Sequence, residues 1–237
     1  MLSYLKTGMA TLLGKHKDLI KNFPLIKQLN YIANNELEDR KQLKQQLLLN
    51  SHSKILSILF GAKMSDINLW LDFGTLLGWY RNKEIISHDC DMDFAILQED
   101  LDKFLKKEQY LIEEGFIRSR TFYVDSEIVE LSYSYNGLNI DIIVYRGDDT
   151  ISSITIDYKL NFFNKPARVE TYEYNLKFDG VEIGEMNNQF VRVPKNTKDY
   201  LYNLYGKDFL IPNENYNWRL NSIYTRIEHR NIRIQLH

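Results

Sequence analysis

The sequence predicts an α/β (α+β) fold, in which helices flank a mixed β-sheet, with a helical N-terminal region and a β-rich C-terminal half. Apolar residues recur at helical spacing through residues 1–60. From Phe116 onward, apolar and polar residues alternate, which is the period of strands. Between these parts, two strand-length runs enclose a glycine turn and a short helical stretch. We therefore expect a helical region of residues 1–60 and a main domain of residues 61–237.

The composition is that of a soluble globular protein with a sizeable core. Of 237 residues, 44% are hydrophobic and 26% are charged. The formal net charge of −2 argues against a general nucleic-acid binder, so no nucleic-acid partner is expected. Cys90 is the single cysteine, which excludes an intrachain disulfide and fits a reducing compartment. Without a leader-like start or a run of membrane-spanning length, we expect a cytoplasmic protein.

The N-terminal region predicts three helical stretches. The first covers residues 1–14, the second runs from Asp18 to Ala33 with an interruption at Pro24, and the third covers about Glu36 to Phe60. Five lysines and one aspartate give residues 1–27 a net charge of +4. Such a basic amphipathic start suits peripheral contact with the inner face of an anionic membrane. The alternative is a helix that packs on its own domain and turns its charges to solvent.

A glycine turn follows the first predicted strand. The apolar run from Ile67 to Leu71 has strand length, and it ends at Asp72-Phe73-Gly74. A short helix is then predicted from Thr75 to Arg81, with Thr75 as its N-cap. A strand, a tight turn and a helix N-terminus aim backbone N–H groups at one point, which suits a phosphate.

An acidic strand comes next, over Asp89 to Ile96. Because strand side chains alternate, Asp91 and Asp93 share one face while Met92 and Phe94 turn to the other. Two neighbouring carboxylates repel each other unless a cation lies between them, and such hard oxygen ligands suit Mg²⁺ or Mn²⁺. The alternative is a solvated acidic edge strand. The phosphate-suited turn just upstream favours the metal-binding interpretation.

The third acidic position lies in a predicted hairpin. After a helix over Asp100 to Gly115, strands from Ile128 to Tyr135 and Leu138 to Tyr145 flank Asn136-Gly137, a typical type I′ turn. Asp141 is an isolated carboxylate within the apolar second strand. A charge there is costly unless it is solvated, paired or bound to a metal. The alternative is an exposed aspartate on a half-buried strand.

The remaining segments predict strands, then helices. Residues 148–192 read as several strands with a turn at Asp179-Gly180, and their tyrosines either line a sugar-binding cleft or simply form core and surface. A strand end, a cap after Pro194 and a helix ending at Gly206 follow. Residues 213–237 predict a final basic helix, whose arginines either meet a phosphate or face solvent: Arg219, Arg226, Arg230 and Arg233.

One stretch resembles a known family. Trp70-Leu71-Asp72-Phe73-Gly74-Thr75-Leu76-Leu77-Gly78, followed by Arg81, Asp89, Asp91 and Asp93, resembles the signature of the LicD / fukutin-related phosphotransferases. The resemblance implies a nucleotidyltransferase-like fold. It also implies transfer of a phospho-alcohol group, such as phosphocholine, ribitol phosphate or glycerol phosphate, from a CDP-linked donor to a sugar hydroxyl of a cell-surface glycan. This chain departs from the pattern at Phe73, Ser87-His88 and Cys90.

The resemblance also implies roles for the acidic residues. Asp91 and Asp93 would hold one or two divalent ions, Mg²⁺ or Mn²⁺, that bridge the donor diphosphate. Asp141 would complete that site or accept the proton of the acceptor hydroxyl. Asp72 and Asp89 would orient these groups.

Further residues would hold the donor. Gly74, Thr75 and the helix N-terminus would bind phosphate oxygens, with Arg81 as an additional cation. The expected partners are therefore a CDP-linked alcohol and a glycan or lipid-linked sugar acceptor. Two other functions remain open: a nucleotidyltransferase that transfers the nucleotide itself, and a catalytically idle binding module of the same fold.

Overall fold

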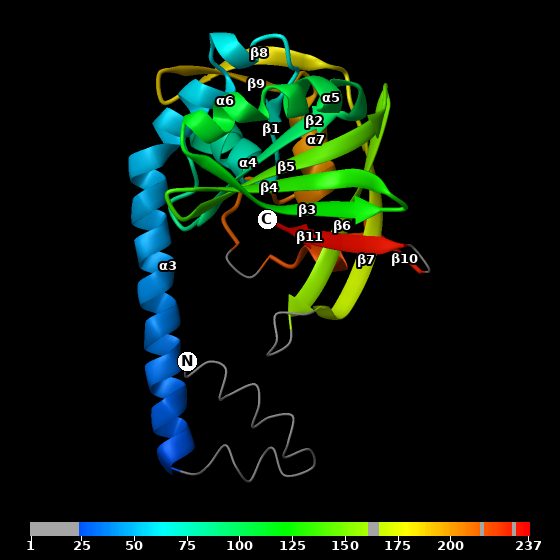
Figure 1. The fold of residues 1–237 in the computed structure, drawn as a ribbon. Coiled ribbons are helices and arrows are strands. Elements are labelled where there is room, and N and C mark those ends of the chain that lie inside the picture. The colour runs from blue at the N-terminus through cyan, green and yellow to red at the C-terminus, as the bar shows by residue number, and fades with distance from the viewer. Residues whose placement is uncertain (1–23, 161–165, 214–215, 229–230) are drawn as a thin grey trace.

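The computed structural model describes residues 24–160, 166–213, 216–228 and 231–237. In these residues a strongly curled sheet is flanked by helices, and one long helix runs along the side of the body (Figure 1). This arrangement confirms the predicted mixed fold. The predicted helix over residues 1–14 and most of the basic segment 1–27 lie outside the described residues, so membrane contact stays a prediction.

The long helix α3 is continuous from Pro24 to Leu59. The predicted gap between the second and third helical stretches is wrong, because α3 continues through it. Pro24 is the first residue of α3, where its missing N–H costs no hydrogen bond, and the part of the second stretch before it lies outside the described residues. The C-terminal half of α3 buries Leu48, Ile55 and Leu59 in the main core, while its N-terminal half extends beyond the body (Figure 1). None of the described helices combines the length and apolar character needed to cross a membrane.

The centre of the sheet is β5 (Leu138–Gly147). One edge of β5 pairs antiparallel with β4 (Glu127–Tyr135), through the predicted turn in which Asn136 and Gly137 have φ of 50° and 84°. The other edge pairs in parallel with the acidic strand β2 (Asp91–Leu97). The sheet therefore places the acidic strand directly beside the strand that carries Asp141.

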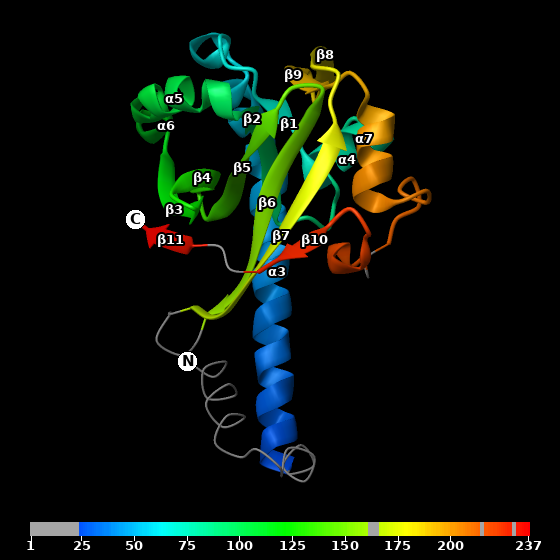
Figure 2. The same cartoon turned by 90° about the vertical axis from the view of Figure 1, so that its right-hand side faces the viewer.

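A strand arm curls away from this centre. Strand β2 occupies most of this edge of β5. Strand β6 (Thr150–Leu160) therefore pairs only with Arg146 and Gly147, the last two residues of β5. Strand β6 then continues with β7 (Pro166–Lys177) as a long ribbon across one face of the sheet (Figure 2). A second, smaller core lies beneath this arm and includes Phe122, Val129 and Ile154.

The C-terminal segment forms strands where the sequence predicted a basic helix. It contains a 3₁₀ turn, η3 (Trp218–Leu220), then β10 (Thr225–Ile227) on the free edge of β7 and β11 (Ile232–Leu236) on that of β3 (Phe116–Val124). The helix prediction is wrong because the segment instead pairs with two open sheet edges, and this tertiary pairing outweighs local helix propensity. Of the four arginines named in the prediction, Arg230 lies outside the described residues. The helix predicted over residues 100–115 is divided in two, over Gln98–Lys106 and Glu108–Glu113.

The other elements are one short strand of the sheet, helices beside it and a separate hairpin. The turn at Asp179-Gly180 and the helix before Gly206 lie where the sequence predicted them. The elements not yet placed are β1 (Trp70–Leu71), α4 (Phe73–Asn82), α5 (Gln98–Lys106), α6 (Glu108–Glu113), η2 (Ala62–Met64), the hairpin of β8 (Val181–Met186) and β9 (Gln189–Pro194), and α7 (Thr197–Tyr205).

Candidate active site

Three adjacent strands present an acidic face. Asp93 on β2 pairs in register with Asp141 on β5, and Asp141 pairs in turn with Ser132 on β4. Residues paired in register point to the same side of a sheet and lie about 5 Å apart. Asp91 lies on the same face, two residues before Asp93. The structure thus brings the three predicted carboxylates together at one place.

A fourth carboxylate joins this face. Glu130 pairs with Ile143 on β5, and it accepts a hydrogen bond of 3.2 Å from the Ser132 hydroxyl. A cleft of about 400 Å³ opens over the acidic face and is closed on its far side by the strand arm. Within it, the buried Oδ1 of Asp141 has no hydrogen-bond partner among the described residues.

Desolvation raises the pKa values of the carboxyl groups in the cleft. Burial, followed by the charges of Asp91 and Asp141, raises the pKa of Asp93 well above its usual value. Burial, followed by the charge of Asp141, raises the pKa of Glu130 to about 8.

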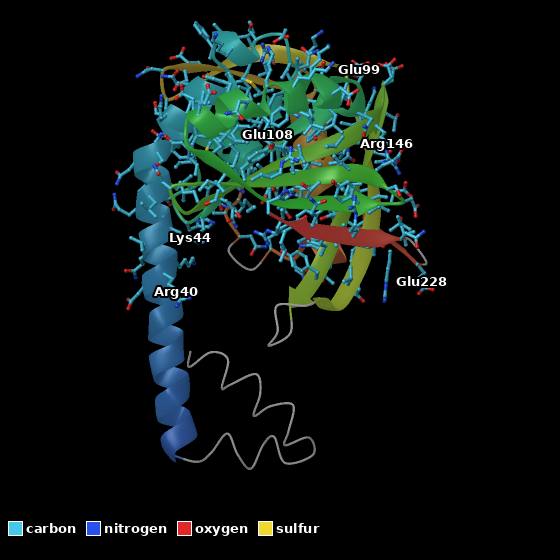
Figure 3. The ribbon with its side chains drawn as sticks, in the orientation of Figure 1. Arg40, Lys44, Glu99, Glu108, Arg146 and Glu228 are labelled. Carbon is cyan, nitrogen blue, oxygen red and sulfur yellow. The ribbon has the colours of Figure 1, made fainter. Side chains whose placement is uncertain are left out.

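Burial raises the pKa of Asp141, and the Ser132 hydroxyl, Arg120 and Lys44 oppose this rise. Desolvation also raises the pKa of Asp91, although this residue is exposed at the start of β2 and Lys44 on α3 (Figure 3) opposes the rise. Among the described residues that line the cleft none is basic, and the positive charges that oppose these rises belong to Lys44 and Arg120 outside its lining.

These features fit a divalent cation. Among the described residues, no three His, Cys, Asp or Glu side chains form a ready-made metal site. The orphaned oxygen of Asp141 and the mutual repulsion with Asp93 nevertheless suit an ion whose remaining ligands come from the substrate. Oxygen ligands of this kind suit Mg²⁺ or Mn²⁺ rather than softer metals. Metal binding by these residues stays a prediction.

Helix α4 begins beside the acidic face. The expectation that Thr75 caps this helix is wrong: the cap is Asp72, whose Oδ1 accepts a hydrogen bond of 2.8 Å from Phe73 N. The Thr75 hydroxyl instead accepts a hydrogen bond of 2.9 Å from Asp93 N, in the first turn of α4. Phe73, with φ of 37°, lies in the left-handed region that favours glycine. The turn therefore holds backbone strain at the edge of the cleft.

Asp72 is held by a buried tyrosine network. Its carboxylate accepts hydrogen bonds from Tyr145 at 2.8 Å and from Tyr200 at 3.0 Å, and Tyr174 donates to the Tyr145 hydroxyl at 3.1 Å. Burial raises the pKa of Asp72 to about 6, while these bonds and the Phe73 N–H oppose the rise. Residues from β5, β7 and α7 thereby fix the start of α4.

Gly74 lies against two carboxylates. A Cβ atom at this position would lie 2.9 Å from Asp89 Oδ2 and 3.8 Å from Asp93 Oδ2. An alanine methyl group at this position would therefore displace the Asp89 carboxylate. Burial, followed by the charge of Asp91, raises the pKa of Asp89 to about 6. The first turn of α4, with N–H groups that lack intrahelical partners, thus opens toward the acidic face.

Arg81 has a structural partner in this structure. Its Nε donates to Phe209 O at 3.0 Å, and Nη2 donates to Ile211 O at 3.2 Å. The side chain also lines a second cleft of about 690 Å³, beside Asp89. Arg81 therefore holds the segment around Phe209 and Ile211 in place, and it also contributes a positive charge to the second cleft. Contact of Arg81 with a donor phosphate stays a prediction.

The comparisons with known proteins now assign a family. Residues 66–202 match the LicD/FKTN/FKRP nucleotidyltransferase domain, and the chain belongs to this family. Among similar proteins is the ribitol-5-phosphate transferase FKTN of Mus musculus, 26% identical over 178 residues, which cover 73% of this chain and 36% of that protein. The Homo sapiens protein of the same name is 25% identical over 195 residues, 80% of this chain and 38% of its own length. This chain thus spans less than two fifths of the length of these relatives.

Sequence reasoning missed several residues of the site. Glu130 carried a signal, because the hairpin register alone places it on the same face as Asp141. The tyrosines around Asp72 gave none, since Tyr145 and Tyr200 meet only when distant elements pack together. The helix predicted over residues 213–237 gave no reason to place the aromatic side chains of this segment at the cleft, where Tyr216, Trp218 and Tyr224 lie.

Proposed function

We propose that this domain transfers a phospho-alcohol group from a CDP-linked donor to a hydroxyl group of a glycan. The observation that carries the proposal is the acidic face beside the glycine turn, where Asp91, Asp93 and Asp141 meet the first turn of α4. Family membership supports it, and relatives named ribitol-5-phosphate transferase support this class of reaction. Such chemistry depends on positioning and charge neutralisation rather than on a covalent intermediate with the enzyme.

The donor diphosphate would lie at the first turn of α4. The backbone N–H groups there form a cradle for phosphate oxygens, and Gly74 lets those oxygens approach the backbone. Asp72 and its tyrosine partners keep the cradle in place. Asp91 and Asp93 would hold Mg²⁺ or Mn²⁺ beside Asp141. A bound divalent ion would neutralise the diphosphate and the carboxylates that face it.

The reaction is a single displacement at the β-phosphorus of the donor. The acceptor hydroxyl oxygen forms a new P–O bond, the bond to the bridging oxygen breaks, and CMP leaves with the electron pair. The hydroxyl proton passes to a carboxylate oxygen. We assign this role to Asp141, because its buried Oδ1 has no hydrogen-bond partner among the described residues and faces the cleft.

The test is incubation with CDP-choline, CDP-ribitol and CDP-glycerol, each with a panel of methyl glycosides and with Mg²⁺ or Mn²⁺. We expect CMP release from at least one donor, together with a glycoside whose mass has increased by the phospho-alcohol group. Asp93→Asn serves as the inactive control. Pyrophosphate release from CTP and a phospho-alcohol would instead show nucleotide transfer. That outcome, or no turnover with any donor, would contradict the proposal.

A further inference from the structure

Two clefts of different charge meet beside the start of α4. The cleft over the acidic face and the second cleft share the residues Gly74, Tyr205 and Tyr216. The second cleft contains the basic side chains Arg81, His88 and Lys207, together with two aspartates. Among the described residues that line the acidic cleft, none is basic. An anionic nucleotide is therefore better accommodated in the second cleft than in the acidic one.

The C-terminal segment adds an aromatic wall to the acidic cleft, formed by Tyr216, Trp218 and Tyr224. The rings of Trp218 and Tyr224 lie 5.0 Å apart between centroids, and Tyr224 lies 5.0 Å from Tyr174 on β7. Tyr205 of α7 extends the wall, 5.0 Å from Tyr216. The three wall residues are each partly exposed, so parts of their rings remain accessible to a ligand.

The aromatic wall is firmly anchored. The side-chain amide of Asn221 donates to Asn203 O at 2.8 Å and to Leu204 O at 2.7 Å, which ties the segment to α7. Arg219 forms an ion pair of 2.6 Å with Asp157 on β6, beside Trp218. Fixing the segment on both sides reduces the entropy that a ligand must remove on binding. The wall therefore has the rigidity of a binding surface.

We propose that the aromatic wall is the acceptor subsite, where a sugar ring of the glycan packs its C–H face on Trp218 and Tyr224. This inference rests on the proposed function. A pyranose or furanose ring is uncharged, so it suits a cleft whose described lining residues include no basic side chain. Its C–H groups carry partial positive charge and are attracted to the negative face of an aromatic ring. Its hydroxyl groups can reach Glu130 and Asp141 on the opposite side of the cleft.

The wall would also determine which acceptor is used. The family match ends at residue 202, so Tyr216, Trp218 and Tyr224 lie outside the matched domain. The matched part carries the acidic face and the phosphate cradle, whereas the wall comes from a segment that follows it. The structure thus separates the residues for phosphoryl transfer from those for acceptor choice.

The first test is saturation-transfer NMR on the whole chain with a panel of methyl hexosides, methyl N-acetylhexosaminides and methyl pentosides. We expect transfer to the ring C–H protons of at least one glycoside. The transfer should disappear in Trp218→Ala and persist in Trp218→Phe. Tyr202→Ala is the matched control, because Tyr202 is 54% exposed on α7 and lines neither of the two clefts. This readout does not depend on turnover, so it can succeed even if the proposed reaction fails.

The second test is kinetic. With an active donor, Trp218→Ala should raise the acceptor KM by about tenfold, as expected for loss of one aromatic contact, while the donor KM stays within about twofold. The inference is overturned if no glycoside binds, if binding is insensitive to Trp218→Ala, or if CMP or choline occupies the wall in place of the sugar.

Discussion

Gly74 and Gly78 provide a matched pair of substitutions, because both lie in α4 and face different obstacles. Alanine in a helix stabilises by up to about 1 kcal/mol relative to glycine. At Gly74 the new methyl group would lie 2.9 Å from Asp89 Oδ2, the end of a movable side chain. That carboxylate must move by about 0.5 Å to restore van der Waals contact. The two effects offset each other, so the free energy of unfolding of Gly74→Ala should lie within about 1 kcal/mol of that of the native protein.

At Gly78 the new methyl group would lie 2.5 Å from the backbone oxygen of Glu84 and 3.0 Å from Ile86 N. Backbone atoms cannot yield as a side chain does, so Gly78→Ala should lose about 1–3 kcal/mol of stability. Urea unfolding at neutral pH measures both changes.

For the rate of CMP release we expect the opposite order, with a larger loss in Gly74→Ala than in Gly78→Ala. Displacing Asp89 beside the phosphate cradle should lower the rate of CMP release in Gly74→Ala by about tenfold or more. Gly78→Ala, assayed at a temperature where it remains folded, should lose less. A fully active Gly74→Ala, or one destabilised as much as Gly78→Ala, would refute the placement of Gly74 against Asp89 and Asp93 at the proposed site.

Three further predictions concern the carboxyl groups of buried Asp72 and half-buried Asp93. The pKa of Asp72 is raised from 3.8 to about 6, so its contribution to stability is complete below about pH 4 and is lost as the pH rises through about 6. This loss corresponds to about 3 kcal/mol of unfolding free energy. In urea unfolding, the difference in unfolding free energy between the native protein and Asp72→Asn should therefore change by about 3 kcal/mol between pH 4 and pH 7. A difference that stays constant with pH would contradict the raised pKa of Asp72. Tyr200→Phe removes a hydrogen bond of 3.0 Å to that carboxylate and should cost about 1.5–3 kcal/mol at neutral pH, whereas a loss below about 0.5 kcal/mol would argue against the network. Asp93→Asn should abolish CMP release yet raise the melting temperature in EDTA, because it relieves repulsion with Asp91 and Asp141; a lower melting temperature would count against an acidic cluster.

Local signals predicted the parts of the site that short-range geometry determines. Asn136-Gly137 fixed the turn of the hairpin, and the alternation over Asp91 to Ile96 separated carboxylates from core residues. The parallel pairing of Asp93 with Asp141 could not be derived from spacing, because more than forty residues separate them. The register came from the packing of β2 against the open edge of β5.

Long-range packing decided what the sequence could not show. Residues 213–237 have helix-compatible composition, yet Ile227 and Ile232 pack against a second core as parts of edge strands. The aromatic wall follows from that pairing. In the sequence, Asp72 only marks the end of the first predicted strand. Its role as a buried helix cap depends on hydrogen bonds from Tyr145 and Tyr200, which come from distant parts of the chain.

The central claim is that the acidic face catalyses divalent-ion-dependent transfer, and Asp141 tests it most directly. Asp141→Asn keeps the size of the side chain and removes its charge. We predict a folded protein whose rate of CMP release, with saturating CDP-alcohol and Mn²⁺, falls by about a hundredfold or more. Asp148→Asn, an exposed carboxylate just beyond β5, is the matched control and should keep the native rate. Native turnover by Asp141→Asn, or full activity of the native protein in EDTA, would contradict the account.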